Sequence, residues 1–141
     1  MLVRLIYASH APEAVSAKVI GDILSEAQTH NLTHGITGLL CFSQNVFVQV
    51  LEGGRTEVNR LYQKLIRDNR HQDITLLKYE EIVERRYANW AMARVELDKI
   101  NMSLLLRYSE QAGLDPYAVS GESTARLLEA LADAGVFNAR D

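Results

Sequence analysis

Two polar side chains stand inside apolar segments of the sequence. Tyr7 alternates with Val3 and Leu5, and Gln49 lies within the apolar run 46–51. Successive side chains of a strand alternate between its two faces, so both polar groups are expected to point to a buried face. Burying an amide without partners costs roughly 1–3 kcal/mol. The pattern leaves two interpretations open. Either a backbone loop or the Tyr7 hydroxyl satisfies Gln49, or a bound polar ring takes up its remaining hydrogen bonds.

Three further residues are candidates for the same site. Asn31 is expected at the end of a helix over the same sheet face, although asparagine is also a common helix terminator. Trp90 and Met92 share a parity at the start of the last predicted strand. Their spacing alone favours two core side chains over the wall of a cofactor pocket.

The other residues that could carry chemistry do not form a catalytic or metal-binding pattern. The sequence has no glycine-rich phosphate loop, no dinucleotide fingerprint and no HExxH or CxxC motif. His30 and His34 have helical ligand spacing. They are expected where the first helix ends, so two loop histidines near solvent are favoured over a metal site. Hydrolytic and metal-assisted catalysis therefore have little support.

The elements that must position these residues follow from periodicity and turn signals. Helices are predicted for residues 12–28, which Pro12 can begin, and for 56–69, which Thr56 can cap. The short polar segment 43–45 is typical of a hairpin. The order β-α-β-β-α-β-β indicates an α+β, ferredoxin-like sheet with both helices on one face. The predicted strands cover residues 2–8, 36–43, 46–52, 74–83 and 91–97.

Residues 98–141 differ in character from residues 1–97, which are expected to form the main domain. Leucine-rich segments suggest one helix near 104–108 and a second that begins at Ser120 or Ser123. A sheet with helices on one face leaves its other face exposed, and large exposed apolar faces are uncommon in soluble proteins. The C-terminal helical pair is therefore expected to cover that face or to form an oligomer contact.

Composition excludes several classes of function. The chain has 141 residues and 48% hydrophobic residues, which suits one globular domain with a modest appendage. The formal net charge of −3 argues against a nucleic-acid surface. No apolar run is long enough to cross a membrane. Cys41 is the single cysteine, so a reducing, cytoplasmic setting is expected.

Five segments together resemble the BLUF domain, a flavin-based blue-light sensor family, and in particular its short, single-domain type. The match runs in order from about residue 2 to residue 97. The resemblance implies a ferredoxin-like fold, a photoreceptor rather than an enzyme, and a non-covalently bound flavin, commonly FAD, with FMN and riboflavin as alternatives. The matching segments are Arg4-Leu5-Ile6-Tyr7-Ala8-Ser9, Asn31 with Gly35-Ile36-Thr37-Gly38-Leu39-Leu40, Phe47-Val48-Gln49-Val50-Leu51-Glu52-Gly53, Asp68 with Arg70-His71, and Trp90-Ala91-Met92.

The resemblance also implies a role for particular residues. Tyr7 would donate an electron and a proton after light absorption, and the amide of Gln49 would rearrange to give a red-shifted signalling state. Asn31 would bind the polar edge of the ring. Trp90 and Met92 would be switch positions that pass the signal to the last strand and the C-terminal helices.

Two pocket positions match the family and two depart from it. Asp68 and His71 would line the flavin pocket. His30 stands where several members have a second asparagine, so hydrogen bonding at that end is expected to differ. Lys64 stands where some relatives have an arginine that meets the C2 carbonyl of the ring, and lysine lacks the planar fork of arginine.

Two other functions stay open from the sequence. One is a dark flavin-dependent reductase, and the other is a regulatory module that binds a small metabolite on the same face. The expected partners are the flavin, further copies of the chain in a dimer or larger ring, and a downstream protein that the sequence does not identify. An absorption spectrum before and after blue light separates these functions.

Overall fold

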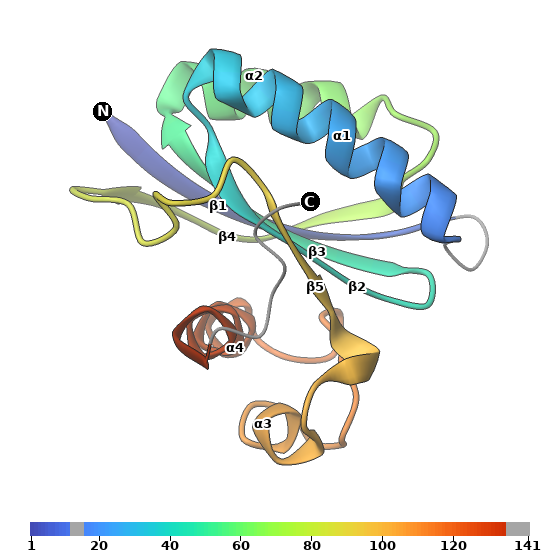
Figure 1. The fold of residues 1–141 in the computed structure, drawn as a ribbon. Coiled ribbons are helices and arrows are strands. Elements are labelled where there is room, and N and C mark those ends of the chain that lie inside the picture. Colours follow the sequence, from blue (N-terminus) through green and yellow to red (C-terminus); the bar gives the residue numbers. More distant parts are fainter. Residues whose placement is uncertain (12–15, 135–141) are drawn as a thin grey trace.

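The computed structural model describes residues 1–11 and 16–134, which form a layered α+β fold (Figure 1). Helices α1 and α2 lie on one face of a five-stranded sheet, and α4 lies on the other. The strands are β1 Leu2–His10, β2 Thr37–Ser43, β3 Val46–Gly54, β4 Gln72–Ile82 and β5 Ala93–Glu96. The helices are α1 Ala17–His34, α2 Arg55–Ile66, α3 Met102–Leu106 and α4 Gly121–Ala134, with a 3₁₀ turn at Leu97–Lys99.

The strands lie in the order β4-β1-β3-β2-β5, so the two strands with the unusual polar residues are neighbours inside the sheet. β1 pairs antiparallel with β3 and β4, and β5 pairs parallel with β2. In this register Tyr7 stands directly opposite Gln49. Directly opposed side chains of an antiparallel pair are close enough to contact each other. The predicted ferredoxin-like arrangement is confirmed.

The first helix extends further toward its C-terminus than the sequence pattern predicts. Ser16 caps its start, because the Ser16 hydroxyl accepts a hydrogen bond from the backbone N–H of Val19 at 3.2 Å. The expected start at Pro12 lies outside the described residues. The helix continues past residue 28 to His34, and Gly35 ends it in the left-handed conformation with φ of 68°. Glycine adopts this conformation without a steric cost, whereas the polar residues before it remain helical.

The predicted boundaries of α2 and β5 also move. α2 begins at Arg55, because the backbone of β3 passes directly into it, so Thr56 is not its cap. The helix ends at Ile66 rather than near Asn69. β5 begins at Ala93, later than predicted, so the residues just before it belong to a connection and not to a strand.

The C-terminal helices pack against the sheet face opposite to α1 and α2. Leu105 of α3 and Leu127, Leu128 and Leu131 of α4 share one hydrophobic cluster with strand residues of that face. The hydroxyl of Ser120 accepts a backbone N–H in the first turn of α4, at 3.0 Å, so the earlier of the two predicted starts is correct. A separate hydrophobic cluster lies under α1 and α2. The division of the chain into two units at residue 97 stays a prediction.

Candidate functional site

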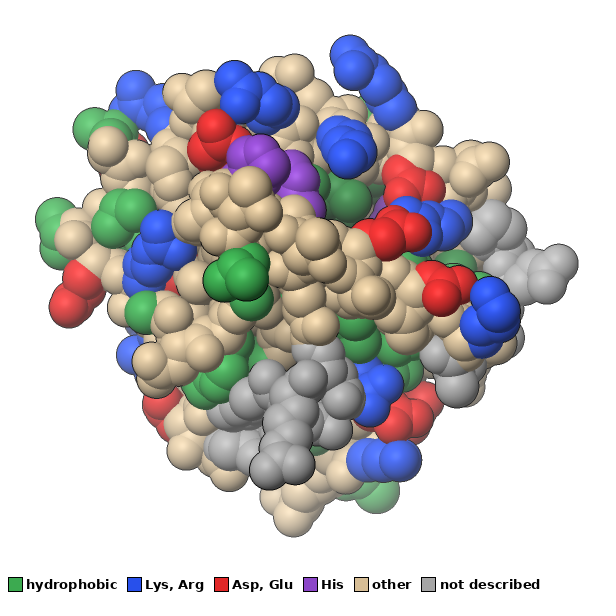
Figure 2. Space-filling view, turned by 45° about the horizontal axis from the view of Figure 1, so that its top comes forward, with side chains coloured by type: hydrophobic (Ala, Val, Ile, Leu, Met, Phe, Trp, Pro, Cys, Tyr) green, Lys and Arg blue, Asp and Glu red, His purple; other side chains and the backbone are tan. Residues whose placement is uncertain are grey.

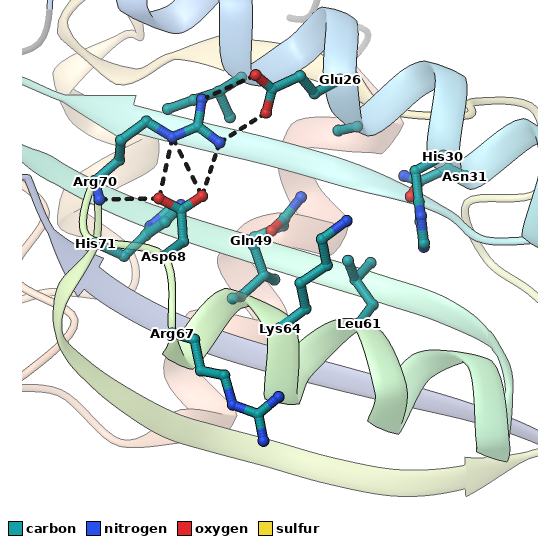
Figure 3. A pocket seen from close by; sticks show the side chains of 13 residues that line it. Glu26, His30, Asn31, Gln49, Leu61, Lys64, Arg67, Asp68, Arg70 and His71 are labelled. Carbon is teal, nitrogen blue, oxygen red and sulfur yellow. Dashed lines mark hydrogen bonds and ion pairs between the residues drawn. The ribbon is translucent and has the colours of Figure 1, made fainter.

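A cavity of about 370 Å³ lies between α1 and α2 above the sheet (Figure 3). Its volume is within the range of ligand and cofactor pockets. In the space-filling view toward the helices, histidine side chains lie beside a hollow that charged side chains of both signs surround (Figure 2). The lining residues come from both helices, from β3 and from the segment between α2 and β4: Ile23, Glu26, Ala27, His30, Asn31, Gln49, Leu61, Lys64, Leu65, Arg67, Asp68, Arg70 and His71.

Tyr7 and Gln49 meet at the base of this cavity. The hydroxyl of Tyr7 donates to Oε1 of Gln49, and Nε2 of Gln49 donates to Sδ of Met92 at 3.3 Å. Gln49 reaches the cavity wall, whereas Tyr7 is fully buried behind it. Burial raises the pKa of the Tyr7 hydroxyl, so the phenol keeps its proton at neutral pH. The Tyr7 hydroxyl therefore satisfies one end of the amide, as the first sequence interpretation expects.

Asn31 lies within the last turns of α1, not at its end as predicted, and its amide is only half satisfied. Its Nδ2 donates to the backbone carbonyl of Ala91 at 2.7 Å. Its Oδ1 is buried without a hydrogen-bond partner in the described ranges, and the same is true of Nε2 of His30. Both residues line the cavity at the same end (Figure 3). A buried polar atom without a partner costs roughly 1–3 kcal/mol, and a ligand that bonded these atoms would remove that cost.

Arg70 joins the two sides of the cavity at its other end. Its guanidinium contacts Glu26 of α1 and Asp68, which follows α2, at 2.7 Å each (Figure 3). The hydrogen bonds from Arg70 hold the pKa of Asp68 below its usual range, and both carboxylates raise the pKa of Arg70. This charged bridge was not predicted as part of the site. Only the tertiary fold brings Glu26 and Arg70 together.

His71 and Lys64 occupy opposite environments in the same wall. His71 is 6% exposed, and its Nδ1 lies 2.9 Å from the hydroxyl oxygen of Ser9. Burial lowers the pKa of His71, so its imidazole is neutral at pH 7. Its ring lies edge-on to Tyr7, with 6.3 Å between the ring centroids. Lys64 projects from α2 and is exposed.

Trp90 and Met92 lie on opposite faces of the sheet. Both precede β5, so the prediction that they stand on the last strand is wrong. Met92 is 1% exposed and belongs to the cluster under α1 and α2, where it contacts Gln49. Trp90 packs against the cluster on the α4 side, with its ring centroid 6.5 Å from that of Tyr87. Their shared parity does not place them on one face, because the chain is irregular there.

His30 and His34 are helical rather than loop residues, which corrects the sequence interpretation. Their rings stack with centroids 4.2 Å apart. Across residues 1–11 and 16–134, no three His, Cys, Asp or Glu side chains come together as a group that could hold a metal ion. In the same part of the chain, no helix combines the length and the apolar character that a bilayer span requires.

The cavity suits a flat ring with a polar edge. Ile23 of α1 and Leu61 of α2 supply apolar surface from the two helices. Asn31 offers an unused acceptor, His30 offers an unused ring nitrogen, and the Gln49 amide reaches the wall. Cofactor sites commonly combine a mostly apolar lining with a few placed polar groups in this way. The residues present therefore fit a flavin.

A ferredoxin-like sheet with such a cavity beneath two helices defines a small ligand-binding α+β domain. Residues 2–93 match the family described as "BLUF: Sensors of blue-light using FAD". This match covers more than half of the sequence, and the chain belongs to the BLUF family. It is thus a member of a family of flavin-binding blue-light sensors, as the resemblance of its motifs predicted.

Known relatives extend the likeness. The chain is 33% identical over 97 residues to the blue light- and temperature-regulated antirepressor BluF of Escherichia coli. The aligned region covers 69% of this chain and 24% of that protein. It is 33% identical over 99 residues to the photoactivated adenylate cyclase subunit alpha of Euglena gracilis. Here the aligned region covers 69% of this chain and 10% of that protein. The chain therefore spans a quarter or less of the length of these relatives.

Two solved structures match nearly the whole chain. The dark-state structure of BlrB, a BLUF protein, superposes with a TM-score of 0.80 at 29% identity, over 95% of this chain and 96% of that one. The photo-activated state of BlsA superposes with a TM-score of 0.79 at 31% identity, over 93% and 94%. The likeness thus extends beyond the matched domain into the C-terminal helices.

Proposed function

We propose that this chain is a blue-light photoreceptor in which Tyr7 and Gln49 carry out the photochemical response to a flavin held in the cavity. The observation that carries the proposal is the run of hydrogen bonds from Tyr7 through Gln49 to Met92 at the cavity base. Such a run connects a phenol, a rotatable amide and the segment that leads to the C-terminal helices. Membership of the BLUF family supports the choice of blue light as the signal.

The cavity walls supply the groups that would hold the flavin. Asn31 would accept a hydrogen bond from the polar edge of the ring through its free Oδ1. Lys64, Asp68 and His71 would line the remaining walls, where they already face the cavity. We propose FAD as the cofactor, with FMN and riboflavin as alternatives that contain the same ring. The ring that these three flavins share is the part that the polar groups of the cavity would contact.

The protein residues can perform the response because of how they are paired. A bound flavin supplies, on excitation, a strong one-electron oxidant. Tyr7 can release an electron and its proton, because Oε1 of Gln49 already accepts its hydrogen. The amide of Gln49 carries an acceptor and a donor at opposite ends, so a half-turn exchanges the two groups. After that turn, Oε1 faces Met92 and the thioether loses its donor.

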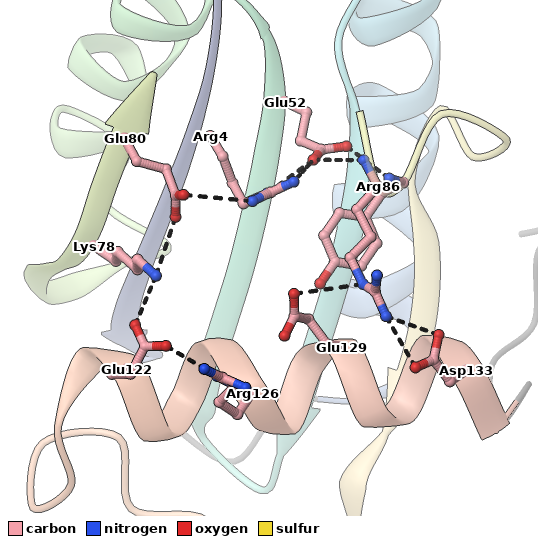
Figure 4. Close-up of polar contacts among 10 residues, drawn as sticks. Arg4, Glu52, Lys78, Glu80, Arg86, Glu122, Arg126, Glu129 and Asp133 are labelled. Atoms are coloured by element: carbon pink, nitrogen blue, oxygen red, sulfur yellow. Dashed lines mark hydrogen bonds and ion pairs between the residues drawn. The ribbon is translucent and has the colours of Figure 1, made fainter. Parts of the chain in front are cut away.

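The loss of this bond would reach α4 through the segment 85–92. The amide of Gln28 holds the near end, because it donates to the Met92 carbonyl at 3.1 Å. At the far end, the Arg86 guanidinium bonds the Asp133 carboxylate of α4 at 2.9 Å (Figure 4). A change at one end therefore shifts the population of two packings of the segment, which is how a local bond can affect a distant helix.

Trp90 and Met92 would be the two signalling residues of this segment. Met92 contacts the cavity base, whereas Trp90 packs on the α4 side. We also propose self-association of the chain as a dimer or larger ring, a cytoplasmic setting and a downstream protein partner. The exposed apolar side chains of α3, Met102 and Leu106, support a contact with another chain.

Absorption spectroscopy tests the photoreceptor function. The purified protein is expected to be yellow, and blue light should shift its band to longer wavelength until it recovers in the dark. Tyr7→Phe should retain flavin and lose the shift, because the electron and proton donor is gone. Tyr79→Phe, which alters an exposed tyrosine of β4, is the matched control and should respond normally. A colourless protein prepared with added flavin, or a full light response in Tyr7→Phe, contradicts the proposal.

A further inference from the structure

The segment that precedes α4 is attached to the sheet at the start of β4. The ring of Tyr117, which lies in this segment, stacks on the ring of His10 at the end of β1, with centroids 4.7 Å apart. The Tyr117 hydroxyl donates to the backbone carbonyl of Asp73 in β4 at 3.0 Å. Nδ1 of His10 lies 3.4 Å from the Asp73 carboxylate. These three residues form a clasp, the Tyr117 clasp, between β1, β4 and the segment before α4.

The clasp holds one residue in a conformation that its side chain disfavours. Asp73 has φ of 53°, in the left-handed region, next to a shift of register in the pairing of β1 with β4. The Cβ of an L-residue makes this conformation unfavourable, so it persists only where surrounding contacts fix it. The Asp73 carbonyl accepts hydrogen bonds from the hydroxyls of Tyr117 and of Thr75, the latter at 3.1 Å. Because Tyr117 is the donor from the C-terminal segment, the conformation of Asp73 depends on the attachment of that segment.

Asp73 lies only two residues from a wall of the cavity. His71 lines the cavity, and its Nδ1 lies 2.9 Å from the hydroxyl oxygen of the buried Ser9 (Figure 3). Ser9 directly precedes His10, so this buried pair and the clasp are neighbours along both chain segments. If the clasp opens, Asp73 can relax to an ordinary strand conformation, and that rotation of the backbone changes the direction in which the chain leaves His71. The orientation of His71 in the cavity wall therefore depends on Tyr117.

We propose that Tyr117 is a positioning residue of the flavin site, which acts through Asp73 on His71 and so couples attachment of the C-terminal segment to occupancy of the cavity. The inference rests on the proposed function, because it assumes a flavin beside His71. It adds a connection between the cavity and the C-terminal segment that is separate from the segment 85–92. Coupling between two sites is reciprocal. Attachment of the clasp should therefore strengthen flavin binding by the same factor by which flavin strengthens the attachment.

The FMN dissociation constant, measured by flavin fluorescence, tests one direction of the coupling. Tyr117→Ala should bind FMN about fivefold more weakly than the parent protein, as a modest coupling between sites predicts. Tyr117→Phe keeps the stacking on His10 and loses the hydroxyl, so it should weaken binding less. Tyr108→Ala is the matched control, since Tyr108 also belongs to the C-terminal segment but packs against Arg107 and the cluster on the α4 side. This control should bind FMN like the parent protein.

Hydrogen exchange tests the reverse direction. The backbone N–H groups of Tyr117 and Ala118 both donate to Asp115, in a turn that the clasp attaches to the sheet. Saturating FMN should slow the exchange of these two amides in the parent protein by about the factor that Tyr117→Ala loses in binding. In Tyr117→Ala, FMN should leave the exchange at these positions unchanged.

A pair of substitutions tests whether Asp73 carries the coupling. Glycine adopts a positive φ without strain, so Asp73→Gly keeps the carbonyl while its conformation no longer depends on Tyr117. In the Asp73→Gly background, Tyr117→Ala should therefore change the FMN dissociation constant by less than about twofold. An equally large effect of Tyr117→Ala in both backgrounds would exclude Asp73 as the connection and overturn the proposal.

The remaining contrary results separate this inference from the function itself. If Tyr117→Ala binds FMN as tightly as the parent protein, or if Tyr108→Ala weakens binding as much, Tyr117 does not position the site. The same conclusion follows if FMN leaves the exchange of the Tyr117 and Ala118 amides unchanged in the parent protein. A parent protein that binds no flavin at all instead refutes the proposed function.

Discussion

The two faces of the sheet hold their buried polar groups in different ways. Under α1 and α2, Asn31 and His30 each leave one buried atom without a protein partner in the described structure. On the α4 side, the fully buried carboxylate of Glu52 accepts hydrogen bonds from the backbone N–H groups of Arg86 and Tyr87, at 3.0 and 2.7 Å (Figure 4). It also pairs with a guanidinium of β1, at 2.8 Å.

This difference indicates what each face is made to bind. A buried charge is tolerated only when hydrogen bonds surround it, and the chain itself supplies them to the Glu52 carboxylate. The hydroxyl of Thr124 in α4 is also buried without a partner among the described residues, but unlike Asn31 and His30 it does not line the flavin cavity. Lys78 of β4 forms an ion pair with Glu122 of α4 at 2.7 Å, which adds a charged contact between the sheet and this helix. The free polar atoms of Asn31 and His30 are the ones that a flavin in the cavity would satisfy. One sheet thus holds a permanent cover on one side and a cofactor cavity on the other.

The largest effect should come from breaking the cavity side at Gln49. Gln49→Leu removes the amide that joins the Tyr7 hydroxyl to Met92, so the light-induced red shift should disappear. The Tyr7 hydroxyl also loses a buried partner, which should lower the free energy of unfolding by roughly 1–3 kcal/mol. Light-minus-dark spectra and urea unfolding measure the two effects. A full red shift in Gln49→Leu would refute the relay role of the amide.

An intermediate effect, on stability rather than on colour, should follow from changing the opposite face. Glu52→Gln removes the charge that pairs with Arg4 and turns one acceptor into a donor against a backbone N–H. We expect the free energy of unfolding to fall by about 3 kcal/mol, with the flavin spectrum retained. Glu81→Gln, on the exposed pair with Arg55, should cost less than about 0.5 kcal/mol. Equal stability of the two variants in urea would show that burial of Glu52 is not what matters.

The smallest effect should come from the contact between the segment 85–92 and α4. Arg86→Gln loses a half-exposed pair with Asp133, so its stability should change by no more than about 1 kcal/mol. Backbone amides of α4 should nevertheless exchange hydrogen faster in the dark, and light should change that exchange less. Arg126→Gln is the matched control, since Arg126 pairs with Glu122 of the same helix. Identical exchange of α4 in both variants would exclude Arg86 as the connection.

Several features of the site could be predicted from the sequence, because they depend on local geometry. The alternation of polar and apolar residues placed Tyr7 and Gln49 on one buried face, and their contact confirms it. The order of elements indicated the sheet. The end of α1 differs from the prediction, because these polar residues are compatible with a helix interior. The hydroxyl of Thr29 donates to the Ser25 carbonyl one turn back, at 3.0 Å, and the buried Asn31 amide bonds a carbonyl outside the helix. Only Gly35, with its positive φ, ends the helix.

Other features could not be predicted, because they join residues far apart in the chain. Glu26 and Arg70 are ordinary charged residues until the fold sets them 2.7 Å apart. Arg86 and Asp133 of α4 are likewise brought within 2.9 Å of each other only by the fold. The opposite placement of Trp90 and Met92 depends on an irregular connection whose path is fixed by amides of α1, not by strand periodicity.

The sequence by itself determined which faces of the regular strands and helices are buried and, through its motifs, the family to which the chain belongs. Side-chain alternation and helical periodicity are properties of the backbone, so they can be followed residue by residue. The tertiary structure alone decided which buried polar atoms are satisfied and which stay free for a ligand. That depends on whether a partner from a distant segment comes within hydrogen-bonding distance, and periodicity carries no information about such distances.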